Sequence, residues 1–155
     1  MPEELRTILL AEDSPKDVEL TLEALAEHNL ANQVVVVKDG VEVLEYLRCE
    51  GNYKLRRKGS PAVLLLDIKM LRMDGLEVLR IIRNDPALKT LPVVILSSSR
   101  EEQDLIRSYE LGVNAYVVKP VDFKEFMEAI KHIGAFWAII NELPTIGVSP
   151  NGDNN

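Results

Sequence analysis

The chain has 155 residues, of which 46% are hydrophobic and 28% are charged, a composition typical of one globular domain. Its 18 basic and 25 acidic residues give a net charge of −7, which argues against non-specific binding to nucleic acid. The single cysteine, Cys49, excludes an intrachain disulfide and a metal site built from several cysteines. No apolar run reaches the ~20 residues of a membrane helix, and residues 1–7 lack the apolar segment of a signal peptide. We therefore expect a cytoplasmic protein without membrane contact.

Five short apolar runs are the predicted strands. They are continuous rather than alternating, and several are rich in Val and Ile, which is typical of parallel strands covered by helices on both faces. In chain order they span residues 7–11, 33–37, 63–67, 92–96 and 115–118.

Segments with helical spacing lie between and after these strands. Three signals precede predicted helices: a cap and proline at Ser14-Pro15, a turn at Asp39-Gly40 and a capping box from Ser99 to Glu102. Two signals follow predicted helices: Asp85-Pro86, where a helix should stop, and Gly112, a closing glycine. The last predicted helix runs from about residue 122 to residue 141. This alternation predicts an α/β domain with a doubly wound parallel sheet and right-handed crossovers.

Polar residues follow the carboxyl ends of four predicted strands, where ligands bind in such sheets. They are Glu12, Asp13, Asp67, Ser97 and Lys119. Clustered carboxylates repel one another, and a hard cation with oxygen ligands, such as Mg²⁺, offsets that repulsion. A carboxylate can also attack phosphorus to give an aspartyl phosphate, while a metal, a lysine and a hydroxyl contact the transferring group. The pattern therefore predicts a metal-assisted phosphoryl site.

These motifs resemble those of the receiver domains of two-component response regulators, and the resemblance covers about residues 7–141. The matching pieces are Glu12-Asp13, Leu65-Leu66-Asp67 with Met73-Asp74-Gly75 behind it, Ser97, and Tyr116 to Pro120 with Lys119 before the proline. The separations of Asp67 from Ser97 and from Lys119 also match the family pattern. The resemblance implies a flavodoxin-like (βα)5 fold with strand order 2-1-3-4-5. We expect residues 1–143 to form the receiver domain and residues 144–155 a flexible tail.

The resemblance assigns a role to each site residue. It implies that Asp67 is the phosphoacceptor and that Mg²⁺ is bound by the carboxylates of Glu12, Asp13 and Asp67. The backbone carbonyl of Lys69 is implied as a further ligand. Lys119 is expected to pair with the phosphoryl group, and the bond between Lys119 and the following proline is usually cis in receivers.

The resemblance also implies a switch and its partners. Ser97 is expected to bind a phosphoryl oxygen and Tyr116 to swing inward, which changes the surface of the fourth helix, fifth strand and fifth helix. The phosphoryl donor is then a sensor histidine kinase, and the chain is no enzyme beyond its own phosphorylation and dephosphorylation. A narrower resemblance, to regulators that serve phytochrome-type kinases, rests on the basic segment after the second helix, residues 108–114 and Phe136-Trp137.

The last predicted helix carries more apolar residues than one buried face requires. Its apolar surface widens near the end through Phe136, Trp137, Ile139 and Ile140. An exposed apolar patch marks an interface, so we expect a homodimer through this helix. No DNA-binding domain is expected after it, and direct DNA binding is not predicted.

Several alternatives stay open at this stage. Receivers commonly have proline at the position of Leu71, and its absence leaves a phosphorylation-independent interaction module as the main rival. A phosphatase of the haloacid dehalogenase type would need a second Asp at position 69, which is Lys69 here. Glu12 and Asp13 taken singly are also compatible with acidic residues at a helix N-terminus. Tyr116 is equally compatible with an ordinary packing role.

Overall fold

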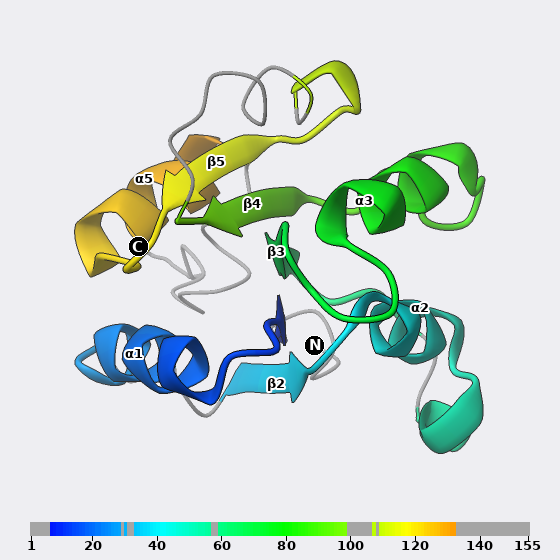
Figure 1. Ribbon diagram of the computed structural model, residues 1–155, viewed down its shortest axis with the longest axis horizontal. Helices are drawn as coiled ribbons and strands as arrows, with labels where there is room; N and C mark the ends of the chain where they lie inside the picture. Colours follow the sequence, from blue (N-terminus) through cyan, green and yellow to red (C-terminus); the bar gives the residue numbers. More distant parts are fainter. Residues whose placement is uncertain are drawn as a thin grey trace, which may run out of the picture.

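A five-stranded sheet lies between two pairs of helices in the structure, a computed structural model (Figure 1). Residues 7–28, 30, 33–56, 59–98, 107 and 109–132 are described. The elements in chain order are β1 (Ile8–Ala11), α1 (Pro15–Ala26), β2 (Val34–Val37), α2 (Gly40–Arg48), the 3₁₀-helix η3 (Gly51–Tyr53), β3 (Val63–Asp67), α3 (Gly75–Asn84), β4 (Val93–Ser97), β5 (Ala115–Val118) and α5 (Phe123–His132).

The strand order is β2-β1-β3-β4-β5, and every neighbouring pair is parallel. This confirms the predicted doubly wound, flavodoxin-like fold. The five predicted strands are present, each with bounds within one residue of the prediction. The central strands β1, β3 and β4 are buried along their whole length, whereas β2 and β5 form the edges and are partly exposed.

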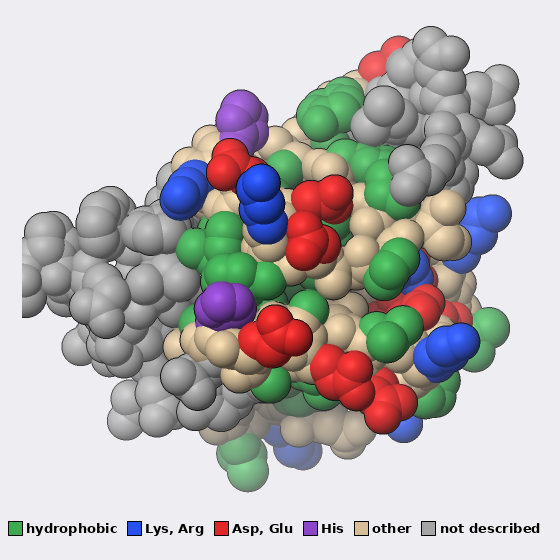
Figure 2. Space-filling view, turned by 90° about the vertical axis from the view of Figure 1, so that its left-hand side faces the viewer, with side chains coloured by type: hydrophobic (Ala, Val, Ile, Leu, Met, Phe, Trp, Pro, Cys, Tyr) green, Lys and Arg blue, Asp and Glu red, His purple; other side chains and the backbone are tan. Residues whose placement is uncertain are grey.

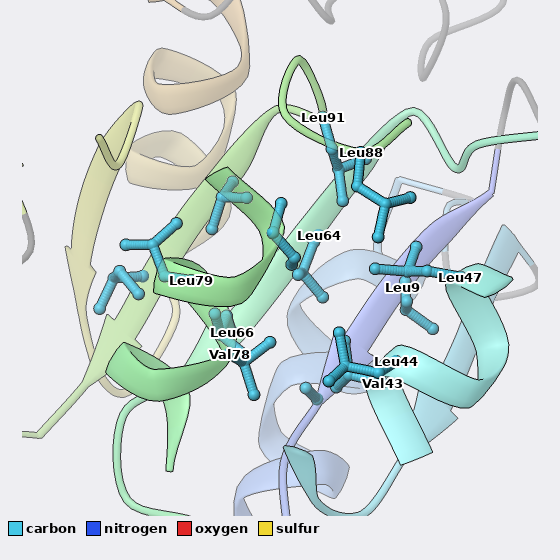
Figure 3. Close-up of a cluster of buried hydrophobic side chains, with 14 of the residues drawn as sticks. Leu9, Val43, Leu44, Leu47, Leu64, Leu66, Val78, Leu79, Leu88 and Leu91 are labelled. Atoms are coloured by element: carbon cyan, nitrogen blue, oxygen red, sulfur yellow. The ribbon is translucent and has the colours of Figure 1, made fainter. Parts of the chain in front are cut away.

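Hydrophobic side chains of the strands are buried on both faces of the sheet, which explains why the strand sequences are continuous apolar runs. Ile8 and Leu10 point to the face covered by α1 and α5, where Phe126 and Ile130 of α5 pack. Leu9 points to the opposite face, covered by α2 and α3. Figure 3 shows this second cluster, in which side chains of β1, β3, α2 and α3 meet; among them are Leu9, Val43, Leu44, Leu47, Leu64, Leu66, Val78 and Leu79.

Three helices begin with a side-chain cap. Ser14 accepts a hydrogen bond from the Asp17 N–H at the start of α1, and proline follows it as predicted. Asp39 accepts from the Glu42 N–H, so it is the cap of α2. The prediction of a separate turn at Asp39-Gly40 was therefore wrong, because Gly40 already belongs to the helix. Asp74 caps α3 in the same way.

The remaining helix predictions have different outcomes. Helix α3 ends at Asn84, before Asp85-Pro86, as predicted. Gly112 follows a helical segment and adopts a positive φ of 87°, which suits a closing glycine. The capping box from Ser99 to Glu102, the last helix beyond His132 and the boundary at 143/144 lie outside the described residues.

The side of the molecule formed by α1 and α5 carries mostly acidic charge, as Figure 2 shows. Exposed acidic side chains on these two helices are Glu19, Glu23, Glu125 and Glu128, and the exposed Glu27 directly follows α1. Among the described residues, no helix is both long and apolar enough to cross a membrane.

Candidate functional site

The carboxyl edge of the sheet brings together residues that are far apart in the chain. Asp67 is the last residue of β3 and Ser97 the last of β4, while Glu12 and Lys119 directly follow β1 and β5. The backbone continues the strand hydrogen bonding at these positions. The Glu12 N–H donates to the Val37 carbonyl at 3.0 Å, and the Lys119 N–H donates to the Ser97 carbonyl at 2.9 Å. The sheet itself therefore fixes where these side chains begin.

Three carboxylates form one cluster at this edge. Ligand oxygens of Glu12, Asp13 and Asp67 all lie within 4.8 Å of one another. Glu12 and Asp67 are buried and Asp13 is half-buried. These three are the carboxylates named from the sequence, and they form an all-oxygen donor set of the kind preferred by Mg²⁺.

The Lys119 ammonium lies among the acidic groups. Its Nζ is 2.9 Å from Glu12 Oε1, 2.8 Å from Asp17 Oδ2 and 3.3 Å from Asp67 Oδ1. Burial opposes the charge on Lys119, but the hydrogen bonds to Asp17 and Glu12 and the negative charge of Asp67 outweigh it and raise the pKa of Lys119. The ammonium is therefore charged at neutral pH.

The Asp67 carboxyl group is buried and lies close to the charges of Glu12 and Lys119. Burial, and then the neighbouring charge of Glu12, raise the pKa of Asp67 from 3.8 to about 7, although Lys119 lowers it. One lysine thus does not offset the negative charge of the cluster. A bound dication would supply the missing positive charge, so the described residues fit the Mg²⁺ predicted from the sequence.

Glu12 is fixed at both carboxylate oxygens. Lys119 donates to Oε1, and the Ser14 N–H donates to Oε2 at 3.2 Å. Ser14, rather than Glu12 or Asp13, has the side chain that caps α1. Glu12 is therefore not the side-chain cap of α1; its carboxylate binds Lys119 and the backbone of Ser14 instead.

The segment after Asp67 turns back closely on the strand. The Gly75 N–H donates to the Ile68 carbonyl at 2.7 Å. A Cβ atom at Gly75 would collide with the Asp67 carbonyl oxygen, so only glycine fits there. Lys69, whose carbonyl was predicted as a metal ligand, lies in this loop and is exposed. Leu71, at the position where receivers commonly have proline, is 69% exposed.

The two predicted switch residues lie on neighbouring strands. Ser97 is buried at the end of β4. Tyr116 is half-buried on β5, opposite Ile95 of β4, and packs against the core cluster on the α2–α3 side. The peptide bond between Lys119 and Pro120 is cis, as the resemblance implied. The predicted interface residues Phe136, Trp137, Ile139 and Ile140 lie outside the described residues.

Sequence reasoning missed two features of this site. Asp17, in the first turn of α1, binds Lys119, and an acidic residue one helical turn after Asp13 was the available signal. Arg72 forms an ion pair with Asp39 beside the loop that follows Asp67. No spacing rule could have indicated this second contact, which joins two different connections of the fold.

Comparisons with known proteins agree with this arrangement. A family model described as the response regulator receiver domain matches residues 8–131. The response regulator Rcp1 of Synechocystis sp. (strain ATCC 27184 / PCC 6803 / Kazusa) is 36% identical over 139 residues, covering 90% of this chain and 93% of Rcp1. A crystal structure of the Mn(2+)-bound form of Rcp1 superposes with a TM-score of 0.69 at 35% identity, covering 92% of this chain and 99% of that one.

Two further solved structures are similar over most of their length. The bacteriophytochrome response regulator AtBRR is 59% identical, with a TM-score of 0.80, and the match covers 90% of this chain and 99% of AtBRR. The phosphorylated cyanobacterial phytochrome response regulator RcpA is 39% identical, with a TM-score of 0.70, and the match covers 92% of this chain and 99% of RcpA.

The raised pKa of Asp67 predicts that its ionised form destabilises the metal-free protein. The folded-state pKa of about 7 exceeds the ordinary 3.8, so the cost is fully present above pH 7 and disappears as the pH falls below about 4. Asp67→Asn should therefore raise the free energy of unfolding at pH 8 by only about 1–3 kcal/mol, because solvent partly screens the repulsion between the carboxylates. Urea unfolding at pH 8 and pH 4, without metal, measures this.

Glu23→Gln, on the exposed side of α1, is the matched control and should change the stability little at either pH. Added Mg²⁺ should stabilise the wild type more than Asp67→Asn. A loss of stability in Asp67→Asn at pH 8 would contradict the predicted excess of negative charge.

Proposed function

This chain belongs to the response-regulator receiver family, and we propose that it is a switch that accepts a phosphoryl group on Asp67 from a histidine kinase in a Mg²⁺-dependent reaction. The observation that carries this proposal is the position of the Lys119 ammonium, 3.3 Å from Asp67 and 2.9 Å from Glu12, within the three-carboxylate cluster. A nucleophile, a cation and a set of metal-binding oxygens then share one edge of the sheet.

The chemical step needs Asp67 in its ionised form. An oxygen of the Asp67 carboxylate forms a bond to phosphorus while the phosphorus–nitrogen bond of the donor's phosphohistidine breaks, and the imidazole nitrogen keeps the electron pair and takes up a proton. Glu12, Asp13, Asp67 and the Lys69 carbonyl would hold Mg²⁺, which would supply positive charge to offset that of the phosphoryl oxygens. Hydrolysis of the aspartyl phosphate by water restores the carboxylate.

Lys119 has the position that charge stabilisation requires. Glu12 and Asp17 orient its ammonium, which lies beside Asp67 before any phosphoryl group is bound. Preorganised charge of this kind needs little rearrangement during the reaction. We assign Lys119 to the phosphoryl oxygens, where it would exchange its contact with Asp67 for one with the new group.

The signal is proposed to travel from Asp67 through Ser97 and Tyr116. Ser97 lies at the end of the strand next to Asp67, and its hydroxyl is assigned to a phosphoryl oxygen. Tyr116 lies on the next strand, and its side chain is assigned to move inward. The negative charge of the phosphoryl group then favours one of two conformations of the β5–α5 surface. A nearly complete shift from one conformation to the other requires that the phosphoryl group stabilise the second by roughly 5 kcal/mol more than the first.

The rival function is a receiver-like interaction module that is not phosphorylated. Its support is Leu71, which leaves the loop after Asp67 without the ring constraint of proline. The charged groups around Asp67 favour phosphorylation, because a module without this chemistry has no need for buried Glu12, Asp67 and Lys119 in contact. Chemical phosphorylation decides between the two.

Acetyl phosphate should add one phosphoryl group to the wild type in the presence of Mg²⁺. The same treatment should add none to Asp67→Asn and none to the wild type when the metal is chelated, because both the nucleophile and the countercharge are needed. Intact-mass spectrometry measures each case. Equal mass gain in Asp67→Asn would exclude Asp67 as the acceptor. No gain in a folded wild type under any condition would exclude the proposed chemistry and favour the interaction module.

The kinase partner is proposed to be of the phytochrome type, in the cytoplasm. The support is similarity to the bacteriophytochrome response regulator AtBRR and the phytochrome response regulator RcpA. A phytochrome-type kinase labelled on its histidine should transfer the label to the wild type faster than an unrelated histidine kinase does, and Asp67→Asn should accept none. Similar rates from both kinases would remove the support for this pairing.

A homodimer is proposed through the predicted last helix, with Phe136, Trp137, Ile139 and Ile140 in the interface. Its support is the apolar sequence pattern. Light scattering over a range of concentrations should show a mass that rises toward that of a dimer, and Trp137→Glu should lower it because a buried charge disfavours the interface. A monomer mass at all concentrations would contradict the dimer.

A further inference from the structure

The loop between β3 and α3 contains a strained turn close to the acceptor residue. Arg72 has a φ of 65°, which is uncommon for a residue with a side chain. The Met73 N–H donates to the Leu71 carbonyl at 2.7 Å, so Arg72 is the central residue of a three-residue turn. Such a conformation is unfavourable for a residue with a side chain and persists only when surrounding contacts hold it.

The guanidinium of Arg72 supplies one such contact. Its Nε lies 2.8 Å from Asp39 Oδ2 and its Nη2 lies 2.9 Å from Asp39 Oδ1, a two-point contact with one carboxylate. Asp39 is itself held, because its side chain caps α2 through the Glu42 N–H at 2.9 Å. Its backbone also forms a parallel bridge with Leu71. The loop is thus attached to the first turn of α2 through both side chain and backbone.

Close packing supports the same attachment. A Cβ atom at Gly40, the first residue of α2, would collide with the backbone oxygen and the Cβ of Met73. The loop therefore rests directly on the helix backbone at this glycine. Asp39 and Gly40 thus contact the loop at residues 71–73, which follow Asp67 by four to six positions in the chain.

We propose that Arg72 and Asp39 are positioning residues for the acceptor site, and that their ion pair holds the loop in the place where receivers commonly rely on proline, at Leu71. The loop contains Lys69, so the pair keeps the Lys69 carbonyl in position to bind Mg²⁺. This inference rests on the proposed function, because it presumes that the site binds the metal. Neither residue is assigned a contact with the phosphoryl group or the metal.

The expected effect is on metal affinity more than on global stability. A partly exposed ion pair contributes little to the free energy of unfolding, but two-point arginine–carboxylate contacts fix orientation. Loss of charge alone would act in the opposite direction at Arg72, because removing a positive charge near the site favours binding of a cation. Weaker Mg²⁺ binding in Arg72→Ala would therefore result from a displaced loop and not from the loss of the positive charge of Arg72.

Calorimetric titration of the full chain with Mg²⁺ tests the proposal. Arg72→Ala should weaken Mg²⁺ binding about tenfold, the lower end of what residues behind a metal ligand contribute. Asp39→Ser keeps a cap for α2 and should weaken binding to a similar extent. Arg80→Ala is the matched control, since Arg80 is 52% exposed against 57% for Arg72 and also pairs with one acid, Glu77. It should bind Mg²⁺ within about twofold of the wild type.

Two further measurements separate positioning from a general loss of structure. The double variant Asp39→Ser/Arg72→Ala should bind Mg²⁺ no more weakly than the weaker single variant, because the residues act as a pair. Without metal, the Met73 and Gly75 amides should exchange hydrogen faster in Arg72→Ala but not in Arg80→Ala, while urea unfolding of the two variants stays similar.

The possible results separate the positioning role of the ion pair from the proposed function. Equal Mg²⁺ affinity and equal amide exchange in Arg72→Ala and Arg80→Ala would overturn the positioning role while leaving the proposed function intact. A wild type that binds no Mg²⁺ would overturn the metal-dependent function and, with it, the assignment of the loop to metal binding. Faster exchange in Arg72→Ala would then show only that the pair holds the loop.

Discussion

The chemistry available at the carboxyl edge of the sheet depends on how the buried negative charge there is compensated. Glu12 and Asp67 are buried, and burial of an unpaired charge costs several kcal/mol. One ammonium, from Lys119, contacts both of them and also Asp17. Asp13 adds a further carboxylate, so the formal charge of the cluster stays negative. Burial and then the charge of Glu12 raise the pKa of Asp67, and Lys119 lowers it only in part. The same excess is what makes the edge suitable for a dication.

The hydrophobic core, rather than attraction between the charged groups, keeps this edge together. Strands β1, β3 and β4 are buried on both faces, and the parallel register aligns their carboxyl ends. The backbone of Glu12 and of Lys119 remains hydrogen-bonded to the neighbouring strands. Repulsion among the carboxylates can therefore change their protonation, but the strands hold the residues too firmly for it to move them apart. A rigid sheet of this kind allows a site to remain charged and ready for a ligand.

The parts that could be predicted from sequence were those with a local or repeating signal. Continuous apolar runs gave the strands, and Ser14-Pro15 and Asp85-Pro86 gave helix limits that the structure confirms. Family spacing indicated the residues at the strand ends. Asp39 was mistaken for part of a turn because Asp-Gly commonly forms one, whereas here it caps α2. The contacts of Asp17 with Lys119 and of Arg72 with Asp39 span 102 and 33 residues, and only the folded chain brings these partners together.

The Asp39 carboxylate serves two elements at once, because it caps α2 and also holds Arg72. Any change at residue 39 therefore acts on the start of a helix as well as on the loop beside Asp67. Arg72 carries only the second function. A lysine there would keep the charge but not the planar two-point contact, and a single ammonium fixes a loop less well. The chain can thus do without proline at residue 71 only while residue 39 offers a carboxylate and residue 72 a guanidinium, a requirement that neither position shows when considered alone.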